Sequence, residues 1–130
     1  MHLLRGMLQS KNAYSPNSMD SLPRQLASMW AFGNVTHLPV PDIDRTDFLL
    51  IVGANPVVTQ GSVLTAPGMG SRIRAIQARG GKVVVIDPRR TATCEIADLH
   101  LPIAAGADAA LFNRLLAEID RRGLIAPDPA

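Results

Sequence analysis

The sequence has little cysteine and few aromatic residues, and each scarcity excludes a class of protein. One of its 130 residues is cysteine and only 4% are aromatic. Cys94 cannot form a disulfide within the chain, and alone it cannot hold an iron–sulfur cluster or a structural zinc ion. This excludes a secreted domain held together by disulfides. We therefore expect a reducing, cytoplasmic environment.

An excess of one charge and a long apolar run are also missing. Thirteen Lys and Arg residues oppose eleven Asp and Glu residues, for a net charge of +2, and no basic stripe of the kind that binds nucleic acid is present. The longest apolar run, residues 48–52, is far shorter than the roughly 20 residues that cross a membrane. At the N-terminus, Arg5 and Gly6 interrupt the apolar core that a signal peptide needs. We expect neither nucleic-acid binding nor a membrane span.

What is present divides the chain into three parts: residues 1–46, 47–125 and 126–130. The first is an irregular segment with one predicted helix, which begins after Asp20 or Ser21 and ends at Gly33. The second carries strong apolar patterns and is expected to form the domain. The third is a short tail.

The patterned part predicts alternating strands and helices. Two continuous apolar runs, residues 48–52 and 83–86, are typical of strands buried on both faces of a parallel sheet. Between them, residues 69–79 predict a helix with its isoleucines inward and its arginines toward solvent. Residues 99–103 predict a short edge strand, and Asp108 opens a last helix. The expected fold is α/β: a partial doubly wound parallel sheet, Rossmann-like, with about three strands and crossover helices.

In such sheets ligands bind outside the carboxyl ends of the strands, so the residues after each strand are the candidate site. After the first strand come Gly53, Ala54, Asn55, Pro56 and Thr59. Exposed amides around this turn could hold a phosphate. The usual glycine-rich fingerprint and the Walker lysine are absent, and a tight turn with no binding role explains the same residues equally well.

After the second strand come Asp87, Pro88, Arg89, Arg90 and Thr91. An acidic side chain here is placed to accept hydrogen bonds from the ribose of a nucleotide held at the first loop. The alternative is that Asp87 caps the next helical turn. The two arginines could clamp a phosphate or be merely solvated.

After the third strand come Gly106 and Asp108. A carboxylate can accept from both N1 and N2 of guanine, so Asp108 could recognise that base. The alternative, favoured by the local sequence alone, is that Asp108 is the N-cap of the last helix. His37 and His100 have no further ligands at metal-binding spacing, so we expect no metal site, and no catalytic residue is assigned. Cys94 is expected to be a small buried side chain.

Taken together, the order and spacing of these segments resemble the molybdopterin oxidoreductases related to formate dehydrogenase, nitrate reductase and dimethyl sulfoxide reductase. The resemblance is carried by DFLLIVGANP (residues 47–56), RGGKVVVIDPRRT (79–91), ADLHLPI (97–103) and GADAAL (106–111). It spans about residues 15–125. Family members are several times longer than this chain, so the resemblance is to one internal α/β domain.

The resemblance implies that this domain binds one of two molybdopterin guanine dinucleotides that flank molybdenum or tungsten, in an enzyme with formate-dehydrogenase-like two-electron chemistry. The implied contacts are the first loop with the pyrophosphate and pterin, the second with the guanosine, and the third with the guanine. The implied partners are the cofactor, the remaining domains of a parent enzyme and electron-transfer subunits.

The chain also departs from the family pattern. It lacks the cysteine cluster that holds a [4Fe-4S] centre in many relatives. Leu26 stands near the place where many relatives supply a ligand to the metal, with Ser28 two residues away, so no protein ligand is assigned. Two alternatives stay open: a stand-alone guanine nucleotide-binding module without catalysis, and an inactive truncated remnant.

Overall fold

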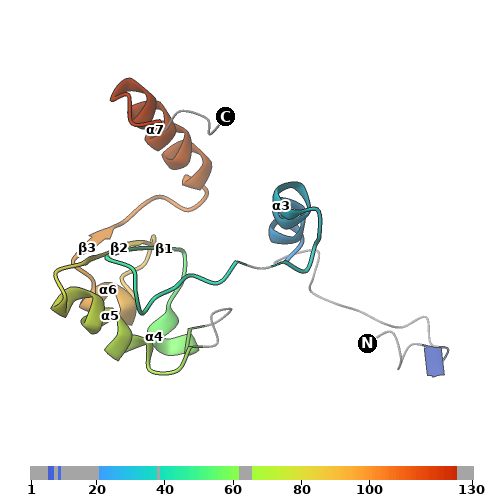
Figure 1. The fold of residues 1–130 in the computed structure, drawn as a ribbon, viewed down its shortest axis with the longest axis horizontal. Coiled ribbons are helices and arrows are strands. Elements are labelled where there is room, and N and C mark those ends of the chain that lie inside the picture. The colour runs from blue at the N-terminus through green and yellow to red at the C-terminus, as the bar shows by residue number, and fades with distance from the viewer. Residues whose placement is uncertain (1–5, 8, 10–20, 38, 62–65, 126–130) are drawn as a thin grey trace. The chain divides into compact units, whose positions relative to one another are not determined.

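The computed structural model describes residues 6–7, 9, 21–37, 39–61 and 66–125 (Figure 1). The chain divides into two compact units, Met1–Val40 and Pro41–Ala130. In the first unit, helix α3 spans Leu22–Phe32 and has proline in its first turn. It ends at Gly33, whose φ of 70° places it in the left-handed region that glycine adopts without strain. The predicted helix is confirmed.

The second unit contains a three-stranded parallel sheet in the order β1-β2-β3. The strands are β1 (Phe48–Val52), β2 (Lys82–Ile86) and β3 (Leu99–Leu101). Helices α4 (Pro56–Thr59), α5 (Met69–Ala78), α6 (Ala92–Ile96) and α7 (Asp108–Arg121) complete the fold. This confirms the partial α/β fold.

The crossover segments cover one face of the sheet. Figure 1 shows α4, α5 and α6 together beneath the three strands. The strand order follows the chain without reversal, and right-handed crossovers that all advance in one direction come to lie on the same face. The carboxyl ends of the strands share one edge, so the three candidate loops all leave the sheet at that edge.

The core lies between this covered face and the helices. Leu49 and Ile51 of β1 pack in one cluster with Val83 and Val85 of β2 and with the fully buried Ile73 of α5. Hydrophobic burial at these positions is the main force that holds the helices to the sheet.

The sequence predicted that both faces of the sheet are covered, but the face opposite the helices carries exposed side chains. Phe48, Leu50 and Leu99 point away from the core and are 59%, 40% and 47% exposed. The expectation of a strand buried on both faces is therefore wrong for β1, because both crossovers fall on one side, whereas none of residues 83–86 in β2 is exposed.

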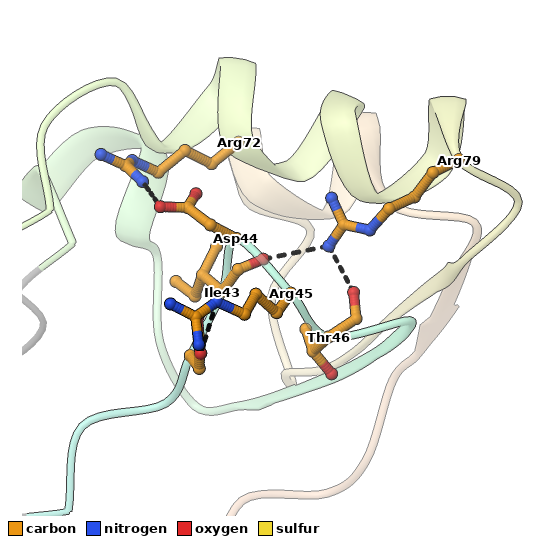
Figure 2. A network of polar contacts seen from close by, with 7 residues as sticks. Ile43, Asp44, Arg45, Thr46, Arg72 and Arg79 are labelled. Atoms are coloured by element: carbon orange, nitrogen blue, oxygen red, sulfur yellow. Dashed lines mark hydrogen bonds and ion pairs between the residues drawn. The ribbon is translucent and has the colours of Figure 1, made fainter.

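A loop before β1 is fixed to α5 by two arginines (Figure 2). Ile43 is buried in the core, and Nη2 of Arg79 donates to the carbonyl of Ile43 at 3.1 Å and to that of Thr46. Arg72 forms an ion pair with Asp44. These two arginines were expected to face solvent. Instead they satisfy the polar groups of a loop that brings an apolar side chain into the core.

At the amino edge, Asp98 joins β2 to the start of β3. Its carboxylate accepts from the backbone N–H of Val83 at 2.8 Å and from Nε2 of Gln77 at 3.1 Å, and it pairs with Nζ of Lys82 at 3.3 Å. These contacts, the Val83 N–H first, lower the pKa of Asp98 below its ordinary value because they favour the charged form.

Helix α7 is amphipathic, as the spacing predicts, with Leu111, Leu115 and Ile119 along one side. None of its residues is buried. Near its C-terminal end, Glu118 pairs with Arg121, and this lowers the pKa of the Glu118 carboxyl. Within the described ranges no helix combines the length and the apolar character that crossing a bilayer requires.

Candidate functional site

The first loop leaves β1 through an open glycine turn. Gly53 has φ of 60° and its N–H donates to the carbonyl of Ile86 at 2.8 Å, which keeps the start of the loop attached to β2. No atom lies within 4 Å of the position that a Cβ at Gly53 would take. Gly53 and Ala54 are both exposed. The backbone here is therefore accessible to a ligand.

Asn55 follows and is anchored on one side only. Its Oδ1 accepts a hydrogen bond from Oγ1 of Thr93 at 2.8 Å, while its backbone carbonyl accepts from the N–H groups of Val58 and Thr59 and starts α4. The Thr59 hydroxyl donates to the same carbonyl at 3.2 Å. Pro56, the first residue of α4, is buried. The side-chain Nδ2 of Asn55 is left without a partner in the part of the chain that the structure describes.

Asp87, directly after β2, is buried and firmly held. The residue is 8% exposed, and Oδ1 of its side chain accepts from the backbone N–H of Arg89 at 2.8 Å. Its N–H donates to the carbonyl of Leu101 at 3.3 Å, and its carbonyl accepts from Nε2 of His100 at 2.9 Å. Oδ2 has no partner among the described residues, so one acceptor remains for a ligand.

The helix cap that we considered for Asp87 belongs to another residue. The N-cap of α6 is Thr91, whose Oγ1 accepts from the N–H of Cys94 at 3.4 Å. Thr91 is buried, and its hydroxyl also lies 3.2 Å from Sγ of Cys94. Cys94 is buried, as predicted. Asp87 instead closes the tight turn at the end of β2, and the Thr91 hydroxyl points inward.

Pro88, Arg89 and Arg90 are exposed. Neither guanidinium forms an ion pair with any residue in the described ranges, in contrast to Arg72 of α5 and Arg79 at the C-cap of that helix. Two unpaired cations beside the Asp87 turn can attract an anionic ligand.

In the third loop, Gly106 turns the chain with φ of 81° before α7. Asp108 is the first residue of that helix and the N-cap is Ala107, which gives no side-chain cap. The alternative role of Asp108 as N-cap is therefore wrong. Its exposed carboxylate interacts favourably with the positive end of the helix dipole and accepts no hydrogen bond within the described part of the chain.

The structure links the first two loops through residues that the sequence analysis did not assign. Thr93 of α6 holds Asn55 in the first loop, and His100 of β3 holds the backbone of Asp87 in the second. Partners this far apart in the sequence leave no local signal. The only hint is that two threonines, Thr91 and Thr93, follow Asp87 at the start of a helix, and one N-cap requires only one of the two hydroxyls. Among described residues, Gly106 and Asp108 form no hydrogen bond with either loop.

No metal ligand set is evident in the described segments. There, no three His, Cys, Asp or Glu side chains are grouped so that they could hold an ion. Ser28 in α3 is buried, and its hydroxyl donates to the carbonyl of Asn34 at 2.7 Å and lies close to that of His37. Its hydroxyl therefore has a structural role in this unit.

Comparisons with known proteins agree with the resemblance found in the sequence. Residues 2–126 match the family model described as "Molybdopterin oxidoreductase". A nitrate reductase from Klebsiella oxytoca is 41% identical over 67% of the chain, and one from Shewanella frigidimarina is 37% identical over 86%. An F420-dependent formate dehydrogenase subunit alpha from Methanocaldococcus jannaschii is 35% identical over 66%. The chain spans 10–12% of the length of these relatives. The chain belongs to the molybdopterin oxidoreductase family.

Proposed function

We propose that this chain forms the part of a larger oxidoreductase that binds one molybdopterin guanine dinucleotide. The observation that carries the proposal is the open carboxyl edge of the sheet. There the Asp87 carboxylate keeps one free acceptor, Asn55 keeps one free donor, and Gly53 leaves the backbone accessible. These groups fit the ribose hydroxyls and phosphates of a nucleotide.

Each loop then has a distinct role. Asn55 donates to the pyrophosphate, Gly53 leaves room for the pyrophosphate and the pterin beside the backbone, Asp87 accepts from the ribose, and Arg89 and Arg90 attract the phosphates from the exposed turn. Asp108 is assigned to the N1 and N2 groups of guanine, which only donate and therefore need an acceptor. A site with donors toward phosphate and acceptors toward ribose and base selects a guanine nucleotide in one orientation.

In the parent enzyme the bound metal and pterin would supply two-electron redox chemistry of the formate dehydrogenase type. The residues of this chain bind and orient the dinucleotide. Leu26 has no ligand atom and the Ser28 hydroxyl is already bonded, so we assign the metal ligand and any [4Fe-4S] centre to other parts of the parent enzyme. Those parts and electron-transfer subunits are the proposed partners. The free, buried Cys94 is compatible with a cytoplasmic location, which we include in the proposal.

The test uses alanine substitutions in a full-length relative, at the positions that match Asp87 and Asp108. Each should lower the molybdenum content and the guanine nucleotide released on denaturation, because each removes an acceptor for the dinucleotide. Unchanged metal and guanine content in both variants would contradict the assignment. Calorimetric titration of the isolated chain with GDP tests the alternative of a stand-alone nucleotide-binding module. That alternative requires binding at millimolar nucleotide or below, and no heat in this range excludes it.

A further inference from the structure

Thr93 occupies an unusual position for a threonine hydroxyl. It lies in α6, has no exposed surface, and is 38 residues from Asn55 in the sequence. Capping of α6 does not require it, since Thr91 is the N-cap. Its hydroxyl instead faces the first loop, where it accepts from the N–H of Val57 at 3.3 Å and donates to Oδ1 of Asn55 at 2.8 Å.

These two contacts fix which way the Asn55 carboxamide faces. A backbone N–H can only donate, so the Val57 contact uses one of the two lone pairs of the hydroxyl and does not use its single proton. That proton needs an acceptor, and Oδ1 supplies it. The Asn55 nitrogen must then face the other way. Because no side-chain nitrogen or oxygen of the described residues is both buried and unpaired, the free Nδ2 reaches solvent.

We infer that Thr93 is a positioning residue for the candidate site: it orients the Asn55 carboxamide so that Nδ2 donates to an anionic oxygen of the bound dinucleotide. The inference rests on the proposed function. It also means that the helix after the second loop sets the geometry of the first loop. A donor held in place before the ligand arrives loses less conformational entropy on binding.

The experiment compares three variants of the whole chain. Thr93→Val keeps the shape of the side chain and removes the hydroxyl, Thr93→Ser restores the hydroxyl, and Thr46→Val makes the same change at the opposite edge, where the hydroxyl donates to the carbonyl of Phe48. Two quantities are measured for each: the heteronuclear NOE of the Asn55 side-chain amide in ¹⁵N NMR spectra, and the dissociation constant for GDP.

We expect the Asn55 amide to be as rigid as the backbone in the wild type, Thr93→Ser and Thr46→Val, and mobile in Thr93→Val. GDP should bind about tenfold more weakly to Thr93→Val, the loss expected for one well-placed hydrogen bond. Thr93→Ser should recover the wild-type affinity. A merely structural role of Thr93 would lower stability without changing the mobility of this one amide.

An equally rigid Asn55 amide in Thr93→Val overturns the inference, as does a wild-type spectrum without the dispersion of a folded protein. A mobile amide with undiminished GDP affinity also overturns it, but leaves the proposed function intact. Absence of GDP binding to the wild type, Thr93→Ser and Thr46→Val in the millimolar range overturns the positioning role inferred for Thr93 and the stand-alone alternative. The proposed function is then decided separately, by the metal and guanine content of the full-length variants.

Discussion

Replacing Gly81 by alanine should break the turn that aligns the first two strands. A Cβ at Gly81 would lie 2.6 Å from the carbonyl oxygen of Asp47, 2.7 Å from Cγ2 of Ile76 and 2.9 Å from the carbonyl oxygen of Ile76. Both oxygens already accept ladder or turn hydrogen bonds, from Lys82 N–H at 2.8 Å and from Gly81 N–H at 2.9 Å. The backbone therefore cannot yield without weakening them.

The expected cost follows from these contacts. Forcing one carbon into a filled space costs about 1–3 kcal/mol, and weakening two backbone hydrogen bonds adds about 1 kcal/mol each. The sum, about 3–5 kcal/mol, is a large part of the roughly 5–13 kcal/mol that stabilises a unit of this size. Because the same turn sets the register of β1 against β2, Gly81→Ala should also displace the Gly53 and Asp87 loops relative to each other.

The adjacent glycine provides the matched control. Gly80 has φ of 89° and open space around its Cβ position, so Gly80→Ala should cost only the backbone strain of about 1–2 kcal/mol. Urea unfolding followed by far-UV circular dichroism gives both free energies. Equal destabilisation by the two substitutions would refute the argument from close contacts at Gly81.

Three further predictions test the electrostatics and the open sheet face. Asp98→Asn should lower the urea midpoint at pH 7. Because the pKa of Asp98 is lowered in the folded state, its contribution to stability is present above the unfolded-state pKa and is lost as pH falls through the folded-state pKa. The difference in stability from the wild type should therefore vanish on acidification. A difference that stays constant down to about pH 2 would contradict this. Arg89→Ala should weaken GDP binding about fivefold at low salt and reduce the salt dependence of binding. Arg74 is also exposed, and Arg74→Ala should change neither quantity; calorimetry at two ionic strengths measures both. Leu50→Lys, on the open face, should cause little loss of stability in urea unfolding, while Ile51→Lys, on the covered face, should destabilise the unit by about 3 kcal/mol or more. Similar unfolding free energies of the two variants would contradict the assignment of faces.

The strands and helices of the second unit could be predicted because their signals are local. The runs at residues 48–52 and 83–86 are continuous and apolar, and they form β1 and β2 almost residue for residue. The helix expected at residues 69–79 and the one opening at Asp108 are also present. Periodicity, glycine stops and apolar runs depend only on neighbours in the chain, so they are legible in the sequence.

Burial and pairing could not be predicted in the same way. Leu49 and Leu50 are adjacent in the same apolar run, but Leu49 is 9% exposed and Leu50 is 40% exposed. The difference arises because both crossovers cover one face, a property of strand order. Likewise, Arg72 and Arg79 have a helix pattern that favours solvent, but a loop some thirty residues earlier lies against them and takes their hydrogen bonds.

The single cysteine by itself excluded a disulfide-stapled domain, the small charge excess made nucleic-acid binding an unfavoured expectation, and the spacing of the three loops indicated the family. The sequence alone also placed candidate residues after each strand, because parallel strands present their carboxyl ends at one edge. Only the tertiary structure decided which atoms remain free there. Asp87 keeps one carboxylate oxygen and Asn55 keeps its nitrogen because Arg89 N–H and the Thr93 hydroxyl occupy the other side of each group. The Asp87 contact is local, two residues along the chain, whereas the contact that leaves the Asn55 nitrogen free joins segments 38 residues apart, which no local pattern contains.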